Sequence, residues 1–180
     1  ARPIRREVSG AVLLILALCT IVSYFGISAI LIDWLADGLK GLFGYGYYLV
    51  GPAMLLAALI LLFHRGRPVQ LRVTCALLLP VLFGTLVHLV LCKETYESGI
   101  GILIRLWKSG IVLASGGVVS GSLAEGSAAV LSPVVSIILF TVLFVVLLMT
   151  AQRLTAGALI EKYRNRPIYE EEPESERKEP

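Results

Sequence analysis

The chain has 180 residues, of which 57% are hydrophobic, with a mean hydropathy of +0.83 and a formal net charge of +3. Soluble globular domains contain about 45–50% apolar residues, so this composition exceeds what one soluble core requires. The apolar residues are grouped in long uncharged runs rather than at amphipathic spacing. This pattern excludes a soluble fold and predicts an all-α integral membrane protein.

The uncharged runs predict four transmembrane helices. The first run, Val8 to Ile32, has 25 residues and follows a short basic segment. At about 1.5 Å per residue it extends about 37 Å, which is enough to cross a hydrocarbon core of about 30 Å. It is also too long for the roughly 7–15-residue apolar core of a cleaved signal peptide. The expected spans are about residues 8–32, 47–63, 73–92 and 132–152.

Two segments between the spans have a different character. In residues 93–108, apolar side chains such as Ile104 and Trp107 repeat at helical spacing, and charged side chains such as Lys108 fall on the opposite arc. This pattern predicts an interfacial helix on the outer membrane surface. Residues 111–123 are uncharged, rich in glycine and serine, and too short to cross a bilayer. We expect them to form a packed or re-entrant segment.

The distribution of basic residues predicts the orientation of the spans, because Lys and Arg are in excess on the cytoplasmic side of membrane proteins. With both ends in the cytoplasm, twelve of the 16 Lys and Arg residues lie inside and four lie outside. A fifth span at 111–123 would export the basic group from Arg153 to Arg166, against this rule. We therefore expect a multi-pass protein with both termini cytoplasmic. The four basic residues expected outside are Lys40, Lys93, Arg105 and Lys108.

The end of the chain differs in composition from the rest. Residues 167–180 contain three prolines and six glutamates, and no aliphatic or aromatic residue follows Tyr169. Such a composition cannot bury enough apolar surface to fold. We expect a transmembrane domain at 1–166 followed by the start of a disordered acidic cytoplasmic linker. Because the chain opens at Ala1 without a methionine, we also expect it to be part of a longer protein.

No signature of catalysis, cofactor binding or metal ligation occurs in the sequence. It has no GxxxxGK[ST] phosphate loop, no HExxH and no closely spaced cysteine pair. His88 is an ionisable residue in the third expected span, so its role is open, and an intramembrane enzyme pairing it with a serine in 115–122 is one alternative. A small polytopic transporter or channel subunit is another. The expected spans contain none of the Asp, Glu, Lys or Arg residues that usually line ion paths.

Four small residues are candidate helix contacts. Gly117 and Gly121 form a GxxxG pair, and Gly116 and Ser120 are also four residues apart. In lipid, small residues at this spacing let helix backbones approach closely. The contacts are either helix packing within one chain or contacts between copies in an oligomer, and the pattern leaves both open.

Two motifs carry a resemblance to a known family. The second span opens with FGYGYYLVGP at residues 43–52, and SGGVVSGSL at residues 115–123 precedes the last span. With four spans and an acidic segment after them, the chain resembles the N-terminal four-helix membrane domain of the FtsK/SpoIIIE family of septal DNA translocases. The resemblance covers essentially the whole chain.

The resemblance implies a bacterial inner-membrane domain that anchors a translocase and targets it to the division septum, in a protein that acts in chromosome segregation and cell division. The ATPase motor would lie outside this sequence. ATP and magnesium are therefore expected only in the motor, and no enzyme activity or cofactor is expected here. The expected partners are the lipid bilayer, further copies in a homo-oligomer of the full-length protein, divisome proteins and, through the motor, DNA.

Overall fold

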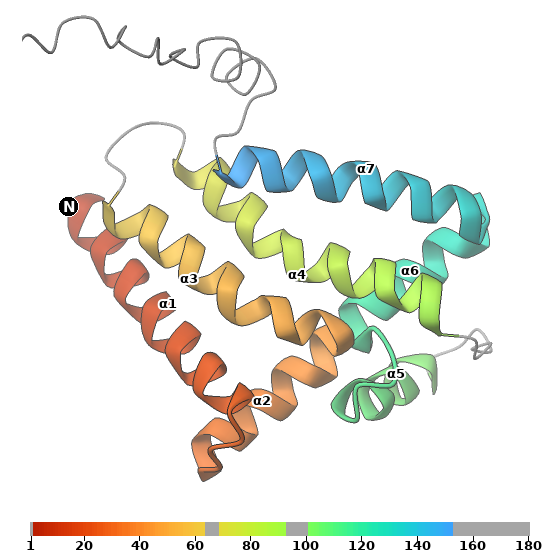
Figure 1. Cartoon of the computed structure of the whole chain (residues 1–180), viewed down its shortest axis with the longest axis horizontal. Helices are drawn as coiled ribbons and strands as arrows, with labels where there is room; N and C mark the ends of the chain where they lie inside the picture. Colours follow the sequence, from red (N-terminus) through yellow and green to blue (C-terminus); the bar gives the residue numbers. More distant parts are fainter. Residues whose placement is uncertain (1, 64–68, 93–100, 153–180) are drawn as a thin grey trace, which may run out of the picture.

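The computed structural model describes residues 2–63, 69–92 and 101–152, and within these ranges every regular element is helical (Figure 1). The predicted all-α class is therefore confirmed. In chain order the elements are α1 (Arg2–Tyr24), α2 (Ile30–Phe43), the short 3₁₀ helix η1 (Gly44–Gly46), α3 (Tyr47–Phe63), α4 (Val69–Leu91), α5 (Gly101–Ile111), α6 (Gly117–Leu131) and α7 (Pro133–Gln152).

The structure confirms the expected number of spans. The second apolar stretch, Ile30–Phe63, contains both α2 and α3, which are separated by η1. α3 alone has the bounds predicted for the second span. α7 begins at Pro133, where a missing backbone N–H costs least because the first helical position has no intrahelical acceptor. The four stretches long and apolar enough to cross a membrane are Glu7–Tyr24, Ile30–Phe63, Gln70–Leu91 and Pro133–Ala151.

The spans pack side by side in the order α1, α3, α4 and α7 (Figure 1). The Tyr24 hydroxyl at the end of α1 donates a hydrogen bond of 2.7 Å to the Tyr47 carbonyl at the start of α3. At the opposite end, Gly10 of α1 lies against the Leu62 side chain of α3. The two helices are therefore antiparallel, and the beginning of α1 lies beside the end of α3.

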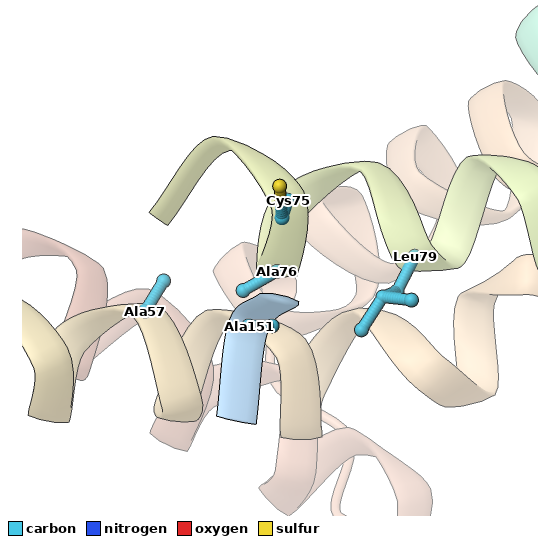
Figure 2. Packing of buried hydrophobic residues seen from close by; sticks show 5 residues of the cluster. All are labelled: Ala57, Cys75, Ala76, Leu79 and Ala151. Atoms are coloured by element: carbon cyan, nitrogen blue, oxygen red, sulfur yellow. The ribbon is translucent and has the colours of Figure 1, made fainter. Parts of the chain in front are cut away.

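α3, α4 and α7 meet at a buried cluster that consists mostly of small side chains, which allow helix backbones to approach closely (Figure 2). This packing matters in lipid, where burial of apolar surface gives no net driving force between helices. The residues of the cluster, each at most 4% exposed, are Ala57, Cys75, Ala76, Leu79 and Ala151.

Arg72 joins the start of α4 to the end of α7. Its side chain is buried, and Nε and Nη2 donate hydrogen bonds of 3.2 and 2.9 Å to the Ala151 carbonyl. That carbonyl belongs to the last turn of α7, where helical carbonyls lack intrahelical donors and a cation is favoured by the helix dipole. The beginning of α1, the end of α3, the start of α4 and the end of α7 gather at one end of the bundle (Figure 1).

The predicted end of the first span, at residue 32, is wrong. α1 ends at Tyr24, the chain turns through Gly26 at φ +73°, and the separate helix α2 begins at Ile30. Because this turn lies within an uncharged run, the run length concealed it. α2 crosses the ends of α1 and α3 instead of continuing along them (Figure 1). It buries Ala36 and Gly41 and carries its charged residues at other positions, as a helix lying in the membrane interface does.

Two other expected segments differ in extent from the structure. Part of the interfacial helix predicted at 93–108 lies outside the described residues, and α5 covers the remainder, with Ile104 exposed and Leu106 buried. The glycine- and serine-rich segment at 111–123 contains a turn and the first half of α6, which continues to Leu131. With 15 residues, α6 extends about 22 Å and is too short to cross a bilayer alone. The acidic segment 167–180 lies outside the described residues.

Candidate functional site

The two glycine-rich motifs, far apart in the sequence, contact each other in the fold. Gly44 has φ +50°, and a Cβ atom there would overlap the Ser115 carbonyl oxygen. The next residue, Tyr45, donates its backbone N–H to the same carbonyl at 3.1 Å. Only glycine allows this approach, because any side chain at residue 44 would meet backbone atoms of the other motif.

α4 presses against this junction at the turns that contain Pro80 and Gly84. A Cβ at Gly46 would overlap the Pro80 carbonyl, and a Cβ at Gly84 would lie 2.7 Å from both the Phe43 carbonyl oxygen and Ser120 Oγ. Proline inside a helix removes one backbone hydrogen bond, and tight packing covers the resulting defect. We call the meeting point of Gly44, Gly46, Gly84, Gly116 and Gly117 the glycine junction.

The four predicted contact residues lie in the first half of α6 and at its cap, and all are buried. A Cβ at Gly116 would lie 3.0 Å from His88 Cβ, one at Gly117 2.6 Å from the Gly44 nitrogen, and one at Gly121 2.7 Å from a methyl group of Leu106. Ser120 faces Gly84. Their surfaces are used within one chain, and a contribution to contacts between copies stays a prediction.

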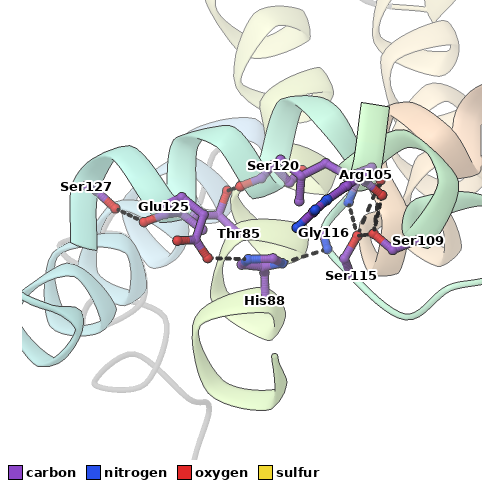
Figure 3. Close-up of polar contacts among 12 residues, drawn as sticks. Thr85, His88, Arg105, Ser109, Ser115, Gly116, Ser120, Glu125 and Ser127 are labelled. Atoms are coloured by element: carbon purple, nitrogen blue, oxygen red, sulfur yellow. Dashed lines mark hydrogen bonds and ion pairs between the residues drawn. The ribbon is translucent and has the colours of Figure 1, made fainter. Parts of the chain in front are cut away.

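His88 of α4 lies beside the glycine junction, and both of its ring nitrogens are engaged (Figure 3). The Gly116 backbone N–H donates to Nδ1 at 2.9 Å, and Nε2 lies 3.1 Å from Glu125 Oε1 on α6. Because Nδ1 accepts a hydrogen bond, the ring proton of the neutral imidazole resides on Nε2 and points to the carboxylate. His88 is 1% exposed and Glu125 33% exposed, so the pair runs from the interior to the protein surface.

We call His88 with its partners Gly116 and Glu125 the His88 centre. Hydroxyl groups extend its hydrogen-bonded network toward α5. Ser115 Oγ accepts hydrogen bonds from Ser109 Oγ at 2.7 Å and from the Gly117 N–H at 3.2 Å (Figure 3). Thr85 Oγ1 of α4 donates to the Ser120 carbonyl at 3.2 Å. These bonds satisfy backbone groups around the turn between α5 and α6, which irregular backbone at membrane depth requires. The arrangement ties α4, α5 and α6 together.

Glu125, Gly44 and Gly84 belong to this site but were not predicted from the sequence as members of it. Glu125 has a detectable signal, because it is the only charged residue between Lys108 and Arg153. A lone carboxylate in a long apolar stretch indicates a buried partner, and His88 is that partner. The close approaches at Gly44 and Gly84 have no such signal, because one sequence does not show which glycines must remain glycine.

The geometry supports a structural role for these polar groups. The bonds described for the His88 ring nitrogens go to Gly116 and Glu125, and both join α4 to α6 or to its cap. Within residues 2–63, 69–92 and 101–152, no three His, Cys, Asp or Glu side chains are grouped as a metal site would require.

A four-span helical membrane domain, with its polar centre used to join its own helices, is the class of protein that this fold defines. The chain belongs to the family described as the 4TM region of DNA translocase FtsK/SpoIIIE, which matches residues 33–164. The match includes both glycine-rich motifs and runs from α2 beyond the end of α7. No curated protein and no solved structure matches the chain.

Proposed function

We propose that this chain is the membrane anchor and septum-targeting domain of a bacterial DNA translocase that acts in chromosome segregation and cell division. The family match over residues 33–164 is the observation that carries the proposal. In this role the domain holds the protein in the inner membrane, while a motor elsewhere in the full-length protein uses ATP and magnesium to move DNA. Oligomerisation of the full-length protein and contacts with divisome proteins belong to the same proposal.

The described residues agree with an anchoring role. Thr85, His88 and Ser109 bond to backbone groups or to another side chain of this region, and the packing at the glycine junction favours one rigid arrangement. A carrier that alternates between two conformations requires elements that separate. Here α4 and α6 approach so closely at Gly84 and Ser120 that even one added carbon atom would collide.

Septal localisation tests the proposal directly. The chain fused to a fluorescent protein and expressed in a dividing bacterium is expected to form a band at midcell. A matched fusion carrying Gly44→Leu, which overlaps the Ser115 carbonyl, is expected to lose this band because the domain cannot fold. Uniform peripheral fluorescence of the unmodified chain, with correct insertion and normal cell division, would contradict septum targeting.

The orientation of the bundle is tested by labelling single cysteines in a cysteine-free background. Gln70 lies on α4 at the end shared with the start of α1, and Gly101 begins α5 at the other end. With both termini cytoplasmic, Gly101→Cys is expected to react with an impermeant thiol reagent in intact spheroplasts. Gln70→Cys is expected to react only after permeabilisation, because the twelve-to-four basic asymmetry predicts that this end lies inside. The reverse pattern would show an inverted domain.

A further inference from the structure

Residues of α2, with Trp107 of α5, line an apolar groove of about 300 Å³. Both helices lie at the end of the bundle opposite the start of α1 (Figure 1). Ligand pockets in proteins begin at about this size. The groove is lined by Leu35, Leu39, Leu42, Trp34 and Trp107, with Asp37 as its titratable group. It does not belong to the glycine junction or to the His88 centre.

The two tryptophans of the chain both line this groove. Trp34 is 77% exposed and Trp107 38% exposed, one on each of the two helices. Tryptophan concentrates at the headgroup level of membranes, where its ring contacts apolar chains and its N–H reaches polar groups. The groove therefore lies at the depth where the headgroup of a lipid meets its acyl chains.

Asp37 gives the groove a preferred charge. Its carboxylate is 58% exposed, and its distance of 3.9 Å from Lys40 Nζ is well beyond the roughly 2.7–2.9 Å of a strong charged hydrogen bond. The carboxylate can therefore accept a hydrogen bond from a second cation. The primary ammonium of an aminophospholipid headgroup is such a cation, whereas a purely anionic headgroup offers no cation to Asp37.

Gly38 lines the groove and leaves open space beside it. A Cβ atom at this position would have no heavy atom within 4 Å, in contrast to the overlaps at the glycine junction. α2 would gain stability from almost any other residue there, because glycine in a helix interior costs about 1 kcal/mol relative to alanine. An open, apolar space beside two interfacial tryptophans fits an acyl chain.

We infer that the groove between α2 and α5 binds one phospholipid of the outer leaflet, with an acyl chain between Trp34 and Trp107 and an amine headgroup at Asp37. The ligand class is a zwitterionic aminophospholipid such as phosphatidylethanolamine. The bound lipid fills the space between two helices that lie in the interface, and it thereby fixes α5 against α2.

The fluorescence of Trp34 and Trp107 reports directly whether a lipid occupies the groove, because the chain has no other tryptophan. Phosphatidylethanolamine with brominated acyl chains is titrated into the detergent-purified chain, and tryptophan emission is recorded. We expect quenching that saturates at about one lipid per chain. Gly38→Leu fills the groove and is expected to weaken this saturable binding at least tenfold, equivalent to ~1.4 kcal/mol. Asp37→Asn is expected to remove the preference over brominated phosphatidylglycerol.

Gly126→Leu on α6 is the matched control, because a Cβ there also meets nothing within 4 Å and the residue lies outside the groove. It is expected to bind lipid as the unmodified chain does, and circular dichroism should show both leucine variants fully helical. Quenching that never saturates, or that is equal in the two leucine variants, would show bulk lipid contact only and overturn the proposal. Tighter binding of phosphatidylglycerol would overturn the headgroup assignment. A change in oligomeric state in Gly38→Leu without a change in quenching would show a protein contact instead.

Discussion

Gly117→Ala is expected to destabilise the domain by about 2–6 kcal/mol, the sum of roughly 1–3 for backbone strain and roughly 1–3 for overpacking. Residue 117 has φ +73°, a conformation that a side chain disfavours, and its added Cβ would lie 2.6 Å from the Gly44 nitrogen and 2.7 Å from the Leu42 carbonyl. Both neighbours are backbone atoms and cannot rotate away. Thermal unfolding in detergent, followed by circular dichroism, measures the loss.

Gly126→Ala is the control for this experiment. It makes the same chemical change on the same helix at a position where the new Cβ meets nothing within 4 Å. Since alanine is the better helix former, this variant should be unchanged or more stable by up to about 1 kcal/mol. Equal stability of the two variants would show that the contact between the motifs is not formed in solution.

The same substitution addresses contacts between copies. If Gly117 acts only within the chain, Gly117→Ala loses oligomers only because the single chain has lost its fold. The surroundings of Gly121 are less strained, because its closest neighbour is the far end of the Leu106 side chain, which can move. Gly121→Ala is therefore expected to fold, and unchanged crosslinking in this variant would show that Gly121 does not contact another copy.

The sequence predicts the spans well where chemical boundaries coincide with helix boundaries. α3 has the predicted bounds, because a glycine- and tyrosine-rich entry precedes it and a basic group follows it. α1 was predicted too long, because the turn at Gly26 carries no charge and lies within the same apolar run as the start of α2. Hydropathy measures the length of a run but does not detect a change of direction within it.

The glycine junction shows a different limit. Its two motifs were recognisable in the sequence, yet their contact depends on the Ser115 carbonyl reaching both Gly44 and Tyr45, which lie far from it in the sequence. Backbone atoms make this contact, and backbone atoms leave no trace in side-chain patterns. The small residues of α6 were identified as contacts, but their neighbours in α2, η1 and α4 became apparent only in the fold.

His88→Leu is expected to lower the free energy of unfolding by about 1–3 kcal/mol, because the buried Gly116 N–H loses its acceptor. Leucine has a comparable size, so the loss reports the hydrogen bond more than a cavity. His88→Asn should recover part of it, since its amide oxygen lies as many bonds from Cβ as Nδ1 does. Unfolding of the detergent-purified variants by heat or by titration with a denaturing detergent measures the series.

Glu125→Gln separates the two bonds of the His88 ring. The glutamine carbonyl oxygen can still accept the Nε2 proton at the position of Oε1, and residue 125 is partly exposed, so a loss below about 1 kcal/mol is expected. The order of stability should therefore be unmodified chain, Glu125→Gln, His88→Asn and His88→Leu. If Glu125→Gln proved the most damaging of the three, the carboxylate charge rather than the bond to Gly116 would hold α4 to α6.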